Sequence, residues 1–161
     1  MNFTFKRMTE TDVWAIMRWQ YGPPYDLYNA TPEDIPEGVQ ELLKPEHAYH
    51  TAFDEQARLV GYCCFGPDAQ VPGGDYTGEA LDIGLGLRPD LTGQGLGLPF
   101  LQAILVFARR EFAPPAFRLT VATFNERAVH LYEKAGFQPT LIFMSQTKPN
   151  AHEFMQMERN R

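Results

Sequence analysis

A glycine-rich junction within residues 81–108 constrains the fold more than any other part of the sequence. A strand-like segment, LDIGLGL, leads through RPDLTG and QGLG into an amphipathic helix, and five of the chain's 13 glycines lie between Gly84 and Gly97. Glycine lets the backbone approach a ligand closely, and a first helical turn presents unpaired N–H groups and a positive dipole end. This pattern predicts an anion site, typically for phosphate, although clustered glycines also suit a simple tight loop.

The helix after this junction is expected over residues 96–110, because apolar residues recur there at helical spacing. Pro99 is compatible with a first turn, where its missing N–H would have no partner. The helix then starts near Gly97, and the amides of about residues 93–98 can converge on one site. The apolar face comprises Leu96, Phe100, Leu101, Ile104, Leu105 and Ala108.

Two common phosphate-binding loops do not match. A P-loop requires Gly-Lys, which occurs nowhere in the chain. The dinucleotide-binding fingerprint requires a third glycine where Phe100 stands, and an acid about 20 residues later. No Asp or Glu lies between Glu111 and Glu126.

A second constellation follows in residues 118–137. Residues 118–123 are rich in β-branched side chains and predict a strand, after which Asn125 is a good helix N-cap and Gly136 a C-terminal cap. Tyr132 falls on the core-facing side of this helix, where its hydroxyl needs a partner. Alternatively, Tyr132 is only a packed aromatic residue.

Together, TGQGLG and N-x-x-A-x-x-x-Y-x-x-x-G-F resemble motifs A and B of the GCN5-related N-acetyltransferase (GNAT) superfamily. The resemblance is close over residues 79–137, and residues 1–65 agree with the family's strand, two helices and strand hairpin. One position departs, since Thr92 stands where the family signature has Gln or Arg. Most of the expected phosphate site is backbone amide and tolerates that change.

The resemblance implies a set of ligand contacts for acetyl-CoA as co-substrate. The end of the central strand would bind the pantetheine arm through its backbone where two strands splay apart, and these residues are Leu85, Gly86 and Leu87. The pyrophosphate would be held by Gly93, Gln94, Gly95, Leu96, Gly97 and Leu98. Asn125 would bond the pantetheine or its neighbourhood, and Tyr132 takes the family's general-acid position. Arg88, Arg127 and Lys134 are available for the outer phosphates.

The chemistry of acetyl transfer supports Tyr132 as the acid. Attack of an amine on a thioester expels a thiolate whose parent thiol has a pKa near ~8.5, and a phenol with a pKa of about 10 remains protonated and able to donate. The amine must also lose a proton to a carboxylate or an ordered water chain, and the first candidate carboxylate is Asp82 and the second Glu79. Some relatives carry a glutamate at the position of Thr120, which cannot serve as a base. Asp82 could instead cap the glycine loop or pair with an arginine, as buried charges usually do.

The acceptor is expected to be a primary amine of a small molecule, peptide or protein. Tyr21, Tyr25 and Tyr28 surround Asp26 in a proline-stiffened loop that suits a cationic amine. The same aromatic residues could equally pack between two helices.

Length and composition predict a single domain over residues 1–161, since 161 residues with 44% hydrophobic content can bury a substantial core. The net charge of −6 and the lack of a basic stripe argue against nucleic acid or acidic membrane as partners. No apolar run approaches the ~18 residues of a membrane span, and residues 1–12 lack the apolar core of a signal peptide, so we expect a cytoplasmic protein.

The adjacent Cys63 and Cys64 should point to opposite strand faces without bridging. His47 and His50 should alternate likewise, and we predict no metal site.

The expected fold class is α/β, with a mixed central β-sheet flanked by helices. Strands are expected at 2–7, 48–54, 58–66, 79–87, 117–123, 137–147 and 152–159, and helices at 9–19, 32–43, 96–110 and 125–135. Residues 67–78 should form a loop or hairpin connection. The terminal strands are able to pair across a homodimer.

Two other functions remain open. One is a CoA-binding sensor or a catalytically silent relative, which would bind the ligand without thioester turnover. The other is a nucleotide-binding module unrelated to acyl transfer, which the missing lysine and ribose-binding acid disfavour.

Overall fold

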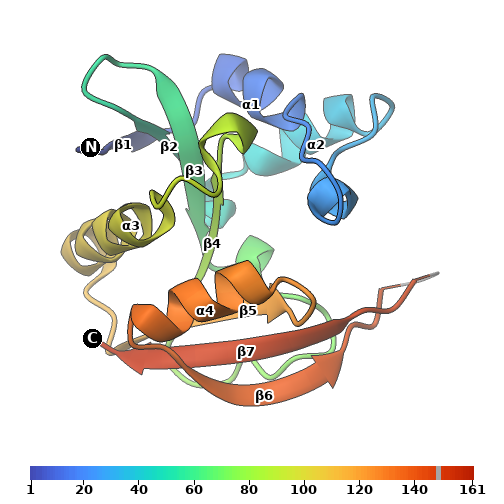
Figure 1. Cartoon of the computed structure of the whole chain (residues 1–161), viewed down its shortest axis with the longest axis vertical. Helices are drawn as coiled ribbons and strands as arrows, with labels where there is room; N and C mark the ends of the chain where they lie inside the picture. Colours follow the sequence, from blue (N-terminus) through green and yellow to red (C-terminus); the bar gives the residue numbers. More distant parts are fainter. Residues whose placement is uncertain (148–149) are drawn as a thin grey trace. The chain divides into compact units, whose positions relative to one another are not determined.

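The computed structural model describes residues 1–147 and 150–161, which form seven strands and four α-helices (Figure 1). The strands are β1 (Thr4–Arg7), β2 (His50–Phe53), β3 (Leu59–Phe65), β4 (Leu81–Leu87), β5 (Ala116–Ala122), β6 (Gln138–Met144) and β7 (Glu153–Asn160). The helices are α1 (Glu10–Met17), α2 (Ile35–Leu42), α3 (Gly97–Phe112) and α4 (Glu126–Lys134). The strands pair in the order β1-β2-β3-β4-β5-β7-β6. This mixed sheet with its helices confirms the expected fold class.

The chain divides into two compact units, each made from two separate stretches of sequence. Unit 1 contains residues 1–64 and 85–97, and unit 2 contains residues 65–84 and 98–161. Strand β4 therefore begins in unit 2 and ends in unit 1. Parallel pairing of β4 with β5 joins Leu81 through Ile83 to Phe117 through Leu119. That pairing stops short of Leu85, the first residue expected to contact pantetheine.

Unit 1 is built on helices α1 and α2 and on antiparallel pairing of β1 with β2 and of β2 with β3. A capping box starts α1, in which Thr9 Oγ1 accepts from the Asp12 amide and the Asp12 carboxylate accepts from the Thr9 amide. The buried core of the unit comprises Met8, Val13, Ile16, Ile35 and Val39. Because the α2 residues 35 and 39 are one helical turn apart, they present one apolar face to this core.

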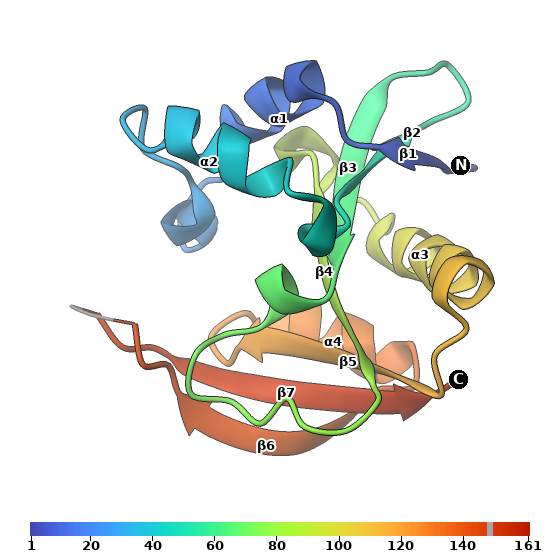
Figure 2. The ribbon, with the colours of Figure 1, turned by 180° about the vertical axis from the view of Figure 1, so that it is seen from behind.

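In unit 2, the C-terminal strand β7 pairs antiparallel with both β5 and β6. Helix α4 lies along one face of these three strands, and the segment of residues 66–80 crosses the opposite face (Figures 1 and 2). Helix α3 buries most of the predicted apolar face, with Phe100, Leu101, Ile104, Leu105 and Ala108 at most 1% exposed, whereas Leu96 precedes the helix and is partly exposed. The Arg109 guanidinium lies 5.4 Å from the ring centroid of Phe117, which places α3 against β5.

One local expectation was wrong. His47 does not alternate with His50 along a strand, because Pro45–His47 forms a 3₁₀ turn and Ala48 adopts a left-handed conformation with φ of +46°. Strand β2 therefore begins only at His50. His47 Nε2 lies 2.9 Å from Glu41 Oε1, which joins the turn to the end of α2. Among the residues described, no helix combines the length and apolar character needed to span a bilayer.

Candidate active site

The loop between β4 and α3 is organised by its own side chains. Arg88 Nε and Nη2 donate to the two carboxylate oxygens of Asp90 at 2.6 and 3.0 Å, and Arg88 Nη1 donates to the Leu59 carbonyl at 2.7 Å. These hydrogen bonds raise the pKa of Arg88 and lower that of Asp90. Gln94 Nε2 donates to the Asp90 carbonyl at 2.5 Å. Arg88, a candidate for the outer phosphates, therefore already has protein partners that hold the loop together.

The glycine loop has a backbone conformation and free amides that suit an anion site. Gly93 and Gly95 have φ of +73° and +77°, a left-handed conformation that favours glycine. Gly93, Gln94 and Gly95 are exposed, and a Cβ built on Gly95 would meet no atom within 4 Å. In residues 1–147 and 150–161, no hydrogen bond occupies the amides of Gly93 through Gly97. Unsatisfied amides in the turn before a helix and in its first turn, here a helix of 16 residues, can bind an anion.

The C-terminal half of β4 leads into this loop. Leu85, Gly86 and Leu87 are each partly exposed. A Cβ on Gly86 would lie 2.5 Å from Cε1 of Tyr62, so this glycine is needed for close packing against the Tyr62 ring. The Leu87 carbonyl accepts from the Tyr21 hydroxyl at 2.7 Å. One of the backbone groups expected to face pantetheine therefore has a protein partner.

The same Tyr21 anchors the proline-containing loop that the sequence suggests for the acceptor. The Tyr21 amide donates to Asn29 Oδ1 at 2.7 Å, and Asn29 Nδ2 donates back to the Tyr21 carbonyl at 3.1 Å. Residues Tyr25–Tyr28 form a 3₁₀ helix between these two ends. Asp26 and Tyr28 are exposed, and no cation pairs with Asp26 in the described part of the chain. Tyr21 is therefore a structural anchor, whereas Asp26 faces solvent.

Asp82 pairs with an arginine, which was the alternative considered for it. Arg118 Nε and Nη2 donate to Asp82 Oδ1 and Oδ2 at 2.6 and 2.9 Å, and Gln70 Nε2 also donates to Oδ2 at 2.9 Å. Asp82 is 5% exposed and Arg118 2% exposed. The hydrogen bonds with Asp82 raise the pKa of Arg118. With both oxygens engaged, Asp82 is poorly placed to take a proton from an amine.

Helix α4 carries the other two candidate residues. Asn125 caps the helix as expected, with Oδ1 accepting from the Ala128 amide at 3.2 Å. Tyr132 is 9% exposed and lies on the buried side of the helix, with its ring centroid 6.3 Å from that of Phe137. Asn125 and Tyr132 therefore belong to unit 2, together with Asp82, while the glycine loop through Gly97 belongs to unit 1.

The sequence-based reasoning missed the segment of residues 66–80 as a source of buried polar contacts. Tyr76 Oη lies 2.7 Å from the Val71 amide and 3.0 Å from Thr120 Oγ1. Gln156 on β7 is 2% exposed and bonds both backbone groups of Asp75. The partners are 44 and 81 residues apart, and a local sequence pattern carries no signal of such contacts.

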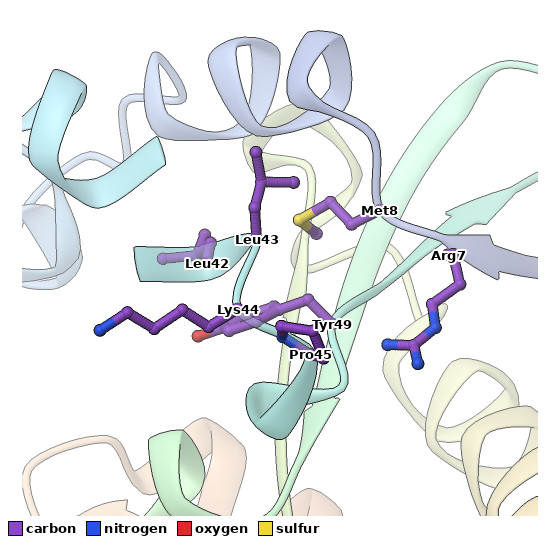
Figure 3. Close-up of a pocket in the computed structure, with 7 residues that line it drawn as sticks. All are labelled: Arg7, Met8, Leu42, Leu43, Lys44, Pro45 and Tyr49. Carbon is purple, nitrogen blue, oxygen red and sulfur yellow. The ribbon is translucent and has the colours of Figure 1, made fainter. Parts of the chain in front are cut away.

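Unit 1 contains a small cavity of about 220 Å³ at the end of α2 (Figure 3). Met8, Leu42, Leu43 and Tyr49 give it apolar walls, and the remaining lining residues are Arg7, Lys44 and Pro45. Its volume is below the ~300 Å³ at which ligand pockets usually begin. None of its lining residues belongs to the predicted site.

The remaining candidate groups are possible metal ligands and the two cysteine thiols. Within residues 1–147 and 150–161, no group of three His, Cys, Asp or Glu side chains is arranged to hold a metal ion. Cys63 and Cys64 are both buried free thiols, and burial raises the pKa of Cys63 well above its usual range. A reactive thiolate requires a lowered pKa, so Cys63 is a core residue.

The chain is similar in sequence to a known protein family and to a curated acetyltransferase. The Acetyltransferase (GNAT) family pattern matches residues 12–137, which include the glycine loop and helix α4. A curated relative, mycothiol acetyltransferase from Propionibacterium freudenreichii subsp. shermanii, is 39% identical over 71 residues. That match covers 43% of this chain and only 22% of the relative. The fold is of the α/β class, and the match over residues 12–137 shows that the chain belongs to the GNAT acetyltransferase family.

Solved structures share the fold over almost the whole chain. A chimera of the spermidine N-acetyltransferase SpeG from Vibrio cholerae with hSSAT has a TM-score of 0.76 at 18% identity, covering 99% of this chain and 96% of its own. The aminoglycoside acetyltransferase AAC(6')-Ib in complex with ribostamycin and coenzyme A has a TM-score of 0.78 at 17% identity, covering 100% and 94%. Another structure of AAC(6')-Ib contains AcetylCoA. At this level of identity the likeness establishes the fold of the chain, and the bound coenzymes belong to those neighbouring structures.

Proposed function

We propose that this chain transfers an acetyl group from acetyl-CoA to a primary amine of a small molecule. The observation that carries the proposal is the family match over residues 12–137, which spans both the exposed amides at the start of α3 and Tyr132. Spermidine and aminoglycosides, named for the neighbouring structures, are amines of the proposed class. A peptide or protein amine is the further acceptor class to test.

The ligand contacts that we propose are those implied by the resemblance of the sequence to the GNAT motifs. Amides of Gly93 through Leu98 bind the diphosphate of acetyl-CoA, supported by the free amides and positive φ values of the loop. Backbone groups of Leu85, Gly86 and Leu87 bind the pantetheine arm, with the Leu87 carbonyl shared with Tyr21. Asn125 adds a contact near the pantetheine while its Oδ1 atom caps α4.

The proposed chemistry is direct attack. The lone pair of the neutral amine forms a bond to the acetyl carbon, the carbon–sulfur bond breaks, and its electron pair leaves on sulfur. The Tyr132 hydroxyl gives its proton to that sulfur, and solvent reprotonates the phenolate. Because Asp82 already accepts three hydrogen bonds, we propose that water takes the surplus proton from nitrogen and that Asp82 holds Arg118.

A second candidate is a CoA-binding relative without turnover. The engagement of Asp82 with Arg118 and Gln70 favours it, because the carboxylate expected to act as base is occupied. This candidate predicts that acetyl-CoA binds but that no amine releases its thiol.

Thiol release from acetyl-CoA, measured against a panel of amines, separates the two. The panel contains spermidine, an aminoglycoside and a peptide with a free N-terminus. We expect turnover with at least one amine, and a kcat lower by about 10²-fold or more in Tyr132→Phe, with unchanged affinity for acetyl-CoA. Tyr49→Phe removes the same hydroxyl outside the proposed site and serves as the control. Binding without thiol release for the whole panel would contradict the proposed function.

We also propose that the protein forms a homodimer through β6, which ends the strand order beside β7 (Figure 2). Ile142 and Met144 are 57% and 55% exposed, and β6 has no charged residue. Two copies can pair such an uncharged apolar edge antiparallel about a twofold axis. Sedimentation of the parent and of Ile142→Lys tests this, since a parent that remains monomeric would refute it.

The cytoplasmic location expected from the sequence stays a prediction.

A further inference from the structure

Within unit 2, the segment of residues 66–80 is held against the sheet by side chains of β5 and β7 and by one backbone amide that follows β6. Gln156 Nε2 donates to the Asp75 carbonyl, and the Asp75 amide donates to Gln156 Oε1, both at 2.7 Å. Arg118 Nη1 donates to the Thr77 carbonyl at 3.0 Å. The Gln146 amide also donates to the Pro72 carbonyl at 2.8 Å. These contacts at several points hold the segment, which carries Tyr76, against the strands; Figure 2 shows the path of the segment across the sheet face.

Tyr76 connects this segment to Thr120 on β5. Its ring centroid lies 5.0 Å from the Arg118 guanidinium, and its Oη atom contacts both the Val71 amide and Thr120 Oγ1. A backbone N–H can only donate, so Val71 occupies a lone pair of Tyr76 Oη. The phenol can then use its own proton toward Thr120. A hydrogen bond received by a hydroxyl oxygen strengthens the hydroxyl as a donor, because chained hydrogen bonds polarise one another.

Thr120 lies just beyond the paired part of β4 and β5. The last parallel pair is formed by Ile83 and Leu119, so the next residue is Thr120 on β5 and Gly84 on β4. Leu85, the first residue proposed to bind the arm that carries the acetyl group, follows directly. Thr120 is partly exposed, and its hydroxyl can donate one hydrogen bond while it accepts another from Tyr76.

We propose that Thr120 is a further catalytic residue of the acetyl transfer, donating its hydroxyl proton as a hydrogen bond to the acetyl carbonyl oxygen, and that Tyr76 is its positioning residue. The inference rests on the proposed function. Amine attack moves negative charge onto the carbonyl oxygen, and a donor aimed there binds the transition state more tightly than the ground state. The Thr120 proton remains on its oxygen throughout.

The test is thiol-release kinetics of Thr120→Val, Thr120→Ser, Tyr76→Phe and the double variant. Loss of one oxyanion donor typically lowers kcat by about 10²-fold or more, so we expect such a loss in Thr120→Val with little change in the acceptor KM. Thr120→Ser keeps the hydroxyl and should recover most of the rate. Tyr76→Phe should lower kcat by a smaller factor in the parent and have no further effect in the Thr120→Val background.

Thr123→Val is the matched control, since it removes a threonine hydroxyl that bonds Glu153 Oε1 at 2.9 Å just beyond β5. Its kcat should equal that of the parent. Thermal unfolding of each variant shows whether it folds. If Thr120 had a structural role alone, its replacement would lower the Tm, serine would not restore kcat, and the effects of the Tyr76 and Thr120 substitutions on kcat would be additive. An active parent with an equally active Thr120→Val variant would overturn the inference alone. A parent that turns over no amine would overturn the proposed function and this inference with it.

Discussion

Replacing Asp82 by asparagine should destabilise the protein strongly, because it leaves the buried Arg118 charge without its main partner. The two side chains are 5% and 2% exposed and share two hydrogen bonds of 2.6 and 2.9 Å. The nearest remaining carboxylate oxygen is on Glu158, 3.6 Å from Arg118 Nη1 and on a side chain that is 38% exposed. The asparagine amide keeps the shape of the carboxylate, removes its charge and replaces one acceptor oxygen by an NH2 group that faces the N–H donors of Arg118 or Gln70.

The expected loss follows from this burial. Removing one partner of a buried, hydrogen-bonded ion pair costs about 3 to 5 kcal/mol, since the other charge stays desolvated. For a chain of this length, 1 kcal/mol corresponds to roughly 2 to 4 °C in Tm. Asp82→Asn should therefore unfold about 6 to 20 °C below the parent.

Thermal and urea unfolding followed by circular dichroism measure this loss. Asp90→Asn is the matched control, because Asp90 also binds an arginine through two hydrogen bonds but its side chain is 63% exposed. An exposed pair contributes little to stability, so this control should unfold close to the parent temperature. Equal shifts in the two variants would refute the reasoning from burial.

Three further predictions follow from local contacts. Gly86→Ala should lower the Tm and weaken acetyl-CoA binding together, because the new Cβ would lie 2.5 Å from Cε1 of Tyr62 and would force that ring to move. A Tm and a Kd equal to those of the parent would contradict this. Cys63 should resist alkylation in the native protein at pH 8, since burial raises its thiol pKa, and mass spectrometry that finds equal labelling with and without urea would disprove the assignment as a core thiol. Thr9→Ala should cost about 1 kcal/mol of unfolding free energy by removing the α1 capping box, and an unchanged urea midpoint would show that the cap is dispensable.

The sequence predicted the regular elements well because their signals are local. Asn125 as N-cap and the apolar spacing from Phe100 to Ala108 depend only on neighbours within a few residues. Boundaries were less accurate. The second helix was expected from residue 32 but begins at Ile35, after a turn in which the Asp34 amide bonds the Thr31 carbonyl.

The partners of the polar site residues could not be predicted in the same way. Asp82 and Arg118 are 36 residues apart in sequence, and the parallel pairing of β4 with β5 brings them side by side. Motif spacing located the glycine loop, but no sequence pattern predicts that Arg88 binds Asp90 and the Leu59 carbonyl. Side-chain pairing across a sheet depends on strand register, which a single sequence does not specify.

Calorimetric titration of acetyl-CoA into the parent and into Gly95→Asp tests the central claim most directly, namely that main-chain amides before α3 bind the diphosphate. Gly95 has φ of +77°, and a Cβ built on it would meet no atom within 4 Å, so aspartate would fit sterically but would strain the backbone and add a negative charge beside the proposed phosphate site. The account predicts saturable binding to the parent and at least about 10-fold weaker binding to the variant. Equal affinities, or no binding to the folded parent at millimolar acetyl-CoA, would contradict it.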